Sequence, residues 1–269
     1  MTKYLWMNLR SLLTNPYLLF WSIAFVEFWV FMWVYVFGTG IPNVEAAVLG
    51  YCATAFGPIV ILSISSAASG IAMTILYASK SVRYITKYTK LSPSRFLAEN
   101  LLSSVLALLV ISGVMFVSLL GVFSSKFGLT PLPKAPIGLS LIILLAALFE
   151  YLLSLFLSLL LVYLRAPRAA SFISFVPLVL GFLPYISLWI NFGSAVYVSP
   201  FNCIASLCYY YYSGDIPPTG GFFMPGANTL VDVNLASVSL VGWLIALILI
   251  DVYLLSKMRG VGMEEVRII

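Results

Sequence analysis

Two acidic residues, Glu27 and Glu150, stand near the middle of long apolar runs, and they are the side chains best placed to do chemistry. An ionised acid at mid-depth in a bilayer costs on the order of 3 kcal/mol or more. One interpretation is that both face a pathway and bind a cation, a proton or a polar group of a substrate. The other is that each is protonated and hydrogen-bonded to a serine or tyrosine of a neighbouring helix. The residue types leave both open.

Other reactive groups are scarce. The chain has no histidine, which removes the commonest general base and metal ligand. No glycine is followed by lysine, so the usual phosphate-binding loop is missing, and there is no GxSxG elbow. Glu264 and Glu265 fit a solvated pair in the tail. We therefore predict no catalytic residue, no metal site and no cofactor in this chain, and we do not expect it to be an enzyme.

The three cysteines, Cys52, Cys203 and Cys208, form no CxxC motif. Their spacing suits neither a zinc site nor an easy local disulfide. We interpret them as small packing residues, with a bridge from Cys52 to one of the other two left open.

The composition defines the elements that must position these residues. The chain is 62% hydrophobic and only 9% charged, against about 25% charged residues in soluble domains. We predict an all-α integral membrane protein with a single transmembrane domain over residues 1–269. The six expected spans are residues 17–37, 46–78, 97–123, 139–164, 170–190 and 235–255.

Two of these spans are unusual. The second is longer than a hydrocarbon core of about 30 Å requires, so it must tilt, kink at Gly57-Pro58 or emerge from the bilayer. The fifth contains Pro177, Gly181 and Pro184 on one face. Such interruptions are tolerated in a membrane only where neighbouring helices or water satisfy the backbone.

Two shorter segments lie outside the spans. Residues 1–16 are amphipathic and too short to cross, which fits an interfacial helix or an ordinary charged flank of the first span. Residues 199–212 begin with the helix-start pair Ser199-Pro200 and stay apolar and aromatic. We predict a short re-entrant or extracellular helix there.

The basic residues predict the topology. With the N-terminus inside, Lys126 and Lys134 alone fall outside, so twelve of the fourteen basic residues lie on the inner side. This distribution obeys the positive-inside rule and places both termini in the cytoplasm of a multi-pass cell-membrane protein. It also accounts for the net charge of +5, so we expect no nucleic-acid partner.

The connector between spans two and three, residues 79–96, carries five basic residues and no acid. Lys80, Arg83, Lys87 and Lys90 recur at spacings that share one helix face, and Ser92-Pro93 marks a new helix start. The segment is either a docking element for a partner protein or a set of charges that fix topology and touch anionic lipid. The residues predicted to carry the contact are Arg83, Tyr84, Lys87, Tyr88, Lys90, Leu91, Ser92 and Pro93.

The ordered pattern resembles the membrane (permease) subunit of type-2 ATP-binding-cassette (ABC) exporters. The segment YLWMNLRSLLTNP is similar to that family's elbow helix, LSPSRFLAENLL to its coupling region, and SPFNCIASL to its outer stretch after span five. The run Tyr209–Tyr212 departs from the charged residues usual there.

The resemblance implies a homo- or heterodimer of six-span subunits with two separately encoded cytoplasmic P-loop ATPase subunits. ATP and Mg would bind to those partners, and residues 79–96 would act as the coupling helix. The substrate would be amphipathic or hydrophobic, and a pathway of Phe25, Glu27, Phe28 and Glu150 suits such a ligand. The alternatives are a secondary transporter or channel that uses Glu27 and Glu150, and a non-transporting membrane scaffold.

Overall fold

The computed structural model describes residues 2–88, 93–164, 169–223 and 229–257. These residues form a bundle of helices, with two isolated β-bridges, Asn191 to Gly220 and Pro218 to Leu230. Five helical stretches are long and apolar enough to cross a membrane: Pro16–Gly40, Glu45–Leu76, Arg95–Phe127, Pro136–Tyr163 and Val233–Leu255. The all-α, multi-pass membrane class is therefore confirmed, whereas the predicted fifth span, residues 170–190, is not a single long helix.

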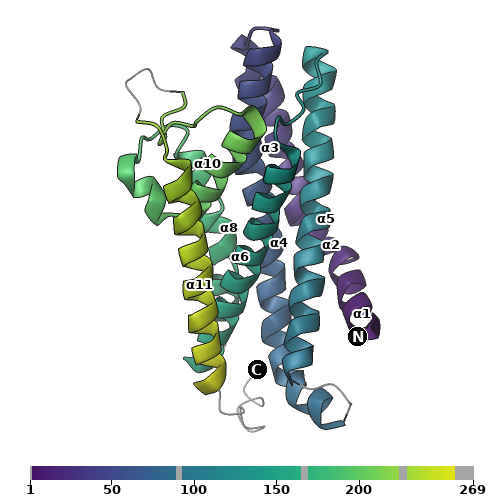
Figure 1. Ribbon diagram of the computed structural model, residues 1–269. Coiled ribbons are helices and arrows are strands. Elements are labelled where there is room, and N and C mark those ends of the chain that lie inside the picture. Colours follow the sequence, from purple (N-terminus) through teal and green to yellow (C-terminus); the bar gives the residue numbers. More distant parts are fainter. Residues whose placement is uncertain (1, 89–92, 165–168, 224–228, 258–269) are drawn as a thin grey trace.

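The first helix, α1 (Thr2–Leu13), is amphipathic and packs beside α5 at one end of the bundle (Figure 1). Asn15 then caps the next helix, because its side-chain oxygen accepts hydrogen bonds from the amides of Tyr17 and Leu18. Pro16 takes the first helical turn, where its missing N–H costs nothing. The chain thus turns sharply from α1 into the first span.

The first span is not a regular α-helix. It consists of α2 (Pro16–Leu19), the π-helix η1 (Phe20–Ala24), α3 (Phe25–Phe31), the π-helix η2 (Met32–Val36) and the 3-10 helix η3 (Phe37–Gly40). Changes of helix type leave carbonyl groups without their usual partners. Here Tyr51 donates its hydroxyl to the Trp33 carbonyl at 2.6 Å, and the Lys126 ammonium donates to the Val34 carbonyl.

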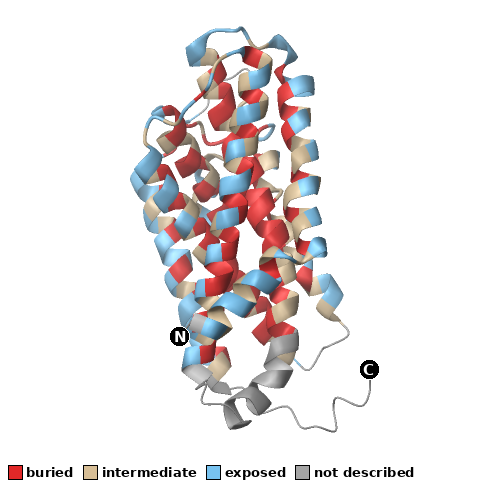
Figure 2. Cartoon of the chain, turned by 90° about the vertical axis from the view of Figure 1, so that its right-hand side faces the viewer, coloured by how far each residue is buried: buried red, intermediate tan, exposed pale blue. Residues whose placement is uncertain are grey.

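Two long helices form the centre of the bundle, α4 (Glu45–Tyr88) and α6 (Pro136–Tyr163). In the apolar stretch of α4, 78% of the residues are buried, and in that of α6 61% are. The corresponding share is 28% in both the first span and α11 (Val233–Lys257). The core therefore runs along α4 and α6, and the first span, α5 (Pro93–Phe127) and α11 present apolar side chains on the outside (Figure 2).

The predicted fifth span, residues 170–190, is broken into three short helices: α7 (Ala170–Ser174), α8 (Val176–Leu180) and α9 (Leu183–Ile186). Pro177 and Pro184 lie in the first turns of α8 and α9, where proline is tolerated. Figure 1 shows that the chain returns along the bundle through this segment, between the end of α6 and the region of α10. Its prolines prevent one continuous helix.

At the opposite end from α1, the 3-10 helix η5 (Gly193–Val198) leads into α10 (Pro200–Ser213), which packs across α4, α6 and α11. Ser199 caps α10 through the amide of Asn202, and Gly214 closes it in the left-handed conformation. Close packing requires a second glycine, because a Cβ on Gly57 of α4 would lie 3.0 Å from the Ala205 carbonyl oxygen.

Candidate functional site

Glu150 lies inside the bundle on α6, where it faces α4. Its side chain is only 2% exposed, and its Oε1 accepts a hydrogen bond of 2.5 Å from the Ser65 hydroxyl. Its other oxygen, Oε2, has no hydrogen-bond partner. Gly181, which follows α8, lies directly behind this pair, because a Cβ there would come within 2.7 Å of Ser65 Cβ. Three elements therefore enclose one acidic side chain.

The Glu150 contact is the first of three polar links between α4 and α6. Ser154 donates to the Ala68 carbonyl at 3.0 Å, and Ser158 donates to the Ala72 carbonyl at 2.8 Å. We call Ser65, Glu150, Ser154 and Ser158 the serine seam. Its members on α6 recur every four residues, so they share one face of the helix. Small hydroxyl residues let two membrane helices approach closely and form hydrogen bonds across the interface.

Glu27 belongs to a different interface, between α3 and α5. Its Oε2 accepts a hydrogen bond of 2.7 Å from the Ser118 hydroxyl, and the residue is only partly buried. The structure therefore gives each mid-span acid a serine partner on a neighbouring helix. It does not bring the two acids into one site, and a shared pathway stays a prediction.

The aromatic residues predicted to line that pathway point in different directions. Phe28 is 56% exposed on the outside of the bundle. Phe25 is half-buried against Trp21, with ring centroids 5.3 Å apart. Trp29 instead faces Phe182 and Tyr185 of the broken segment, at centroid distances of 6.0 and 5.4 Å.

The predicted coupling segment continues α4 without a break as far as Tyr88, and α5 begins at Pro93 as predicted. Residues 79–88 are therefore the end of the second long helix and not a separate one. The backbones of Arg83, Tyr84, Lys87 and Tyr88 lie on this end, and their side chains are outside the described part of the structure. Lys90, Leu91 and Ser92 lie outside the described residues altogether.

A polar joint links the start of α5 to α1. Glu99 is buried, and its Oε1 pairs with Arg95 Nε at 2.9 Å while its Oε2 accepts from the Leu5 amide at 3.1 Å. Arg95 and Glu99 are four residues apart on one helix, whereas no local pattern predicts the contact of Glu99 with α1. Asn8 of α1 adds a hydrogen bond of 2.6 Å to Ser103.

Two tyrosines extend this joint. Tyr4 packs against Phe96 with the rings tilted and their centroids 5.2 Å apart. Burial raises the pKa of the Tyr4 hydroxyl, and its hydrogen bond with Asn100 acts in the opposite direction. Tyr151 of α6 donates to the Asn100 side chain at 3.2 Å. A carboxylate near a helix N-terminus is also favoured by the helix dipole, which supports the position of Glu99 beside the first turns of α1. The joint therefore connects α1, α5 and α6.

Asp251, on the last part of α11, is a further acid inside the bundle. It is 3% exposed, and neither carboxylate oxygen has a hydrogen-bond partner. The Lys257 side chain is outside the described part of the structure. The burial of Asp251 follows from the packing of α11 on α6, which no local sequence pattern reveals.

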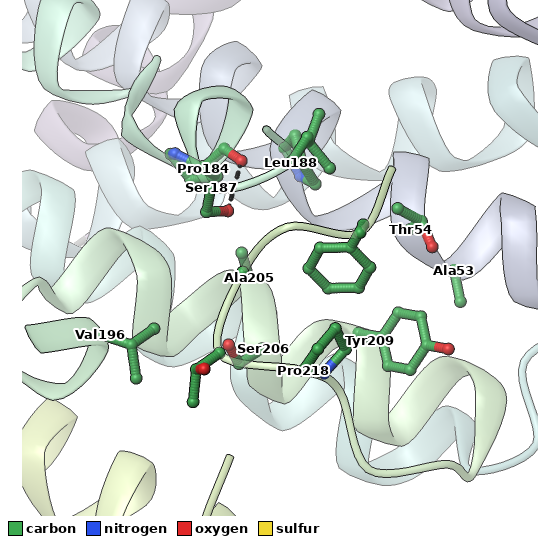
Figure 3. Close-up of a pocket in the computed structure, with 14 residues that line it drawn as sticks. Ala53, Thr54, Pro184, Ser187, Leu188, Val196, Ala205, Ser206, Tyr209 and Pro218 are labelled. Carbon is green, nitrogen blue, oxygen red and sulfur yellow. Dashed lines mark hydrogen bonds between the residues drawn. The ribbon is translucent and has the colours of Figure 1, made fainter. Parts of the chain in front are cut away.

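At the other end of the bundle, α4, α9, α10 and the loop of residues 217–222 enclose a small pocket (Figure 3). Its volume is about 20 Å³, which is room for about one water molecule. Tyr209 lines it, and burial raises the pKa of the Tyr209 hydroxyl. A substrate-sized molecule does not fit the pocket in this conformation.

The tyrosine run Tyr209–Tyr212 and the cysteines serve packing at this end. Tyr212 is fully buried, donates to the Pro131 carbonyl at 2.6 Å and contacts Cys52 Sγ at 3.2 Å. Cys52, Cys203 and Cys208 are all buried and free, so no disulfide forms among them. Within the described residues, no three His, Cys, Asp or Glu side chains gather as a metal site.

Comparisons with known proteins do not assign the chain to a group. No family model matches it, and neither a curated protein nor a solved structure shows significant similarity.

Proposed function

We propose that this chain is the permease subunit of an ATP-driven exporter, driven by separate cytoplasmic P-loop ATPase subunits. The observation that carries the proposal is the hairpin of α4 and α5. With 44 residues, α4 is about 66 Å long at 1.5 Å per residue, roughly twice the hydrocarbon core. Its last part, which carries the basic residues, extends with the start of α5 beyond the ends of α6 and α11 (Figure 1).

A basic segment carried on a continuous helix suits a docking element better than a loose set of topogenic charges does. A force applied by a partner at the tip of this hairpin would be transmitted along α4, the central helix of the bundle, and along α5. Glu99 then links the start of α5 to α1 through the Leu5 amide. In this proposal α1 is an interfacial elbow, α7 to α9 together make the fifth of six crossings, and both termini lie in the cytoplasm. ATP and Mg bind to the partner ATPase subunits. Two such subunits bind one dimer, which consists either of two copies of this chain or of this chain and a second six-span subunit.

The proposal is tested by purifying the tagged full-length chain from membranes of its own host in mild detergent. We expect a P-loop ATPase to co-purify. The double variant Arg83→Glu with Lys87→Glu should reduce its recovery about tenfold or more, because charge reversal opposes electrostatic docking. A matched control is Lys3→Glu with Arg10→Glu, two exposed basic residues of α1 near the same end of the bundle. No ATPase with the unmodified chain, or equal recovery with both variants, would contradict the proposal.

The second candidate is a secondary transporter or channel, and the observation in its favour is the unpartnered Oε2 of Glu150. Buried acids inside membrane helices commonly mark ion or proton paths. The chain reconstituted alone in liposomes would then conduct protons or cations, and Glu150→Gln would abolish the flux. If liposomes that contain the unmodified chain show no more proton or cation flux than liposomes that contain the Glu150→Gln variant, this function is excluded. A chain that neither conducts nor recruits an ATPase would be a scaffold.

A further inference from the structure

Three buried polar atoms belong to neighbouring side chains between the first span and α9, and none makes a hydrogen bond of ordinary geometry, although the Trp33 indole and the Tyr185 hydroxyl are close enough to interact. They are the indole Nε1 atoms of Trp29 and Trp33 and the hydroxyl of Tyr185, all of them buried. Buried indole N–H and phenol O–H groups normally find a partner, because leaving them bare forfeits the hydrogen bonds they made with water. An unpaired set of three in one place therefore calls for an occupant.

The ring geometry shows that the three side chains belong to one cluster. The Tyr185 ring lies 5.4 Å from the Trp29 ring and 6.4 Å from the Trp33 ring, centroid to centroid. Phe182 completes the group at 6.0 Å from Trp29 and 5.7 Å from Tyr185. We call Trp29, Trp33, Phe182 and Tyr185 the indole site.

The local sequence explains how the site is built. Trp29 and Trp33 are four residues apart, so they share one face of the first span. Phe182 and Tyr185 lie on either side of the break before α9, where Pro184 occupies the first helical turn. Pro184 itself faces the pocket on the opposite side of α9, together with Ser187 and Leu188 (Figure 3). The break therefore leaves Phe182 and Tyr185 free to face the first span.

The chemistry of the site defines its ligand. Two N–H groups can only donate, and the phenol can donate or accept, so together they recognise an oxygen that accepts hydrogen bonds. The four side chains carry no charge, and their rings favour a flat apolar body. Trp33 is 1% exposed, whereas Trp29, Phe182 and Tyr185 are half-buried at the rim. Phe28 and Ile186 beside that rim are exposed on the apolar outside of the bundle.

We infer that the indole site binds a neutral, apolar, ring-containing compound through a carbonyl or ether oxygen, which enters sideways from the bilayer. A water molecule can fill the polar position in the free protein, and the ligand oxygen takes its place. The inference names the class of compound that the proposed exporter would carry and takes its biological meaning from that function. Binding itself requires no ATPase, so the two proposals can fail separately.

The test uses the full-length chain in phosphatidylcholine nanodiscs, photolabelled with benzophenone and mapped by mass spectrometry. Benzophenone carries both the ring and the acceptor oxygen. We expect the label on the peptides that contain Trp29–Trp33 and Phe182–Tyr185. Excess fluorenone should compete, whereas fluorene, which has the same shape without the oxygen, should compete at least five times less well, since about one net hydrogen bond is lost.

Conservative variants separate the polar atoms from the rings. Trp33→Phe with Tyr185→Phe keeps two aromatic rings but removes one N–H and the O–H, and it should reduce labelling about five- to tenfold. Tyr185→Phe alone, a milder change, should give an intermediate loss if the double variant does not purify as a single species. The control is Trp189→Phe, a nearby tryptophan that is largely exposed, which should stay within twofold of the unmodified chain.

Two results would overturn the inference. One is equal competition by fluorene and fluorenone, or equal labelling of all variants, which would mean that water alone occupies the polar position. The other is label spread over exposed aromatics such as Phe28 and Phe31, which would indicate partition into lipid. Specific labelling without co-purification of an ATPase would instead support the indole site and contradict the proposed exporter function.

Discussion

The serine seam and the first span both carry polar groups inside a membrane bundle, but the two regions differ in whether these groups have hydrogen-bond partners on a facing helix. Along the seam the hydroxyls of Ser65, Ser154 and Ser158 each have an acceptor on the facing helix. In the first span the indoles of Trp29 and Trp33 are buried without one. The seam joins the two most buried spans, whereas the first span is among the least buried.

This difference separates a fixed part of the molecule from a part that can change its contacts. Close packing and three hydrogen bonds between the helices hold α4 and α6 together, so movement there would break several interactions at once. The first span contains two π-helical segments, which are frequent at functional sites. If a pathway opens, we expect the first span to move against α9 while the seam stays closed.

The largest expected effect comes from forcing the seam apart. Gly181→Val should destabilise the protein by about 3 kcal/mol, because overpacking a tight core carries costs of this size and the new Cβ would lie within 2.7 Å of Ser65. Gly181 has ordinary helical backbone angles, so the clash alone would be responsible. The measurement is the unfolding midpoint in detergent. Gly113→Val is the matched control, since nothing lies within 4 Å of a Cβ there, and equal losses would refute the close contact.

A smaller effect should distinguish the two mid-span acids. Ser65→Ala removes the hydrogen-bond donor that Glu150 has within the described part of the structure, and it should cost about 2 kcal/mol, as is typical when a buried polar group loses its partner. Ser118→Ala at Glu27 should cost about 0.5 kcal/mol, because Glu27 is only partly buried and keeps access to other partners.

Ser66→Ala serves as the control for the same substitution in the same helix. The Ser66 hydroxyl is buried but bonds only the Leu62 carbonyl of its own helix. Its loss should change the unfolding midpoint less than Ser65→Ala does. A Ser118→Ala effect as large as that of Ser65→Ala would show that the first span is held as firmly as the seam, and the comparison would fail.

Much of the secondary structure was predictable because its signals are local. The apolar runs, Pro93 at the start of α5 and the Ser199-Pro200 cap of α10 each depend on residues within one or two helical turns. The length of the second apolar run likewise predicted a helix that must tilt, kink or emerge from the bilayer core. Serine partners for Glu27 and Glu150 were among the alternatives considered, but not which serines.

The remainder depends on contacts between distant parts of the chain. The joint between Glu99 and the Leu5 amide spans 94 residues, and that between Ser65 and Glu150 spans 85. The π-helical segments have no sequence signature that we recognised. Pro177 and Pro184 marked a weak fifth span, but only the fold shows that the break turns Tyr185 towards Trp29.

The smallest expected effect compares two tyrosines on either side of Trp33. Tyr51 donates to the Trp33 carbonyl at 2.6 Å, so Tyr51→Phe should lower stability by about 1 kcal/mol and leave that carbonyl unpaired. Tyr185 lies on the other side, where its hydroxyl makes no hydrogen bond of ordinary geometry with the protein, so Tyr185→Phe should cost less than Tyr51→Phe in the absence of ligand. Both variants keep the ring, and the unfolding midpoint reports the difference. A loss with Tyr185→Phe equal to that with Tyr51→Phe would mean that the Tyr185 hydroxyl is already satisfied in the free protein, and the first span would then be as fully bonded as the seam.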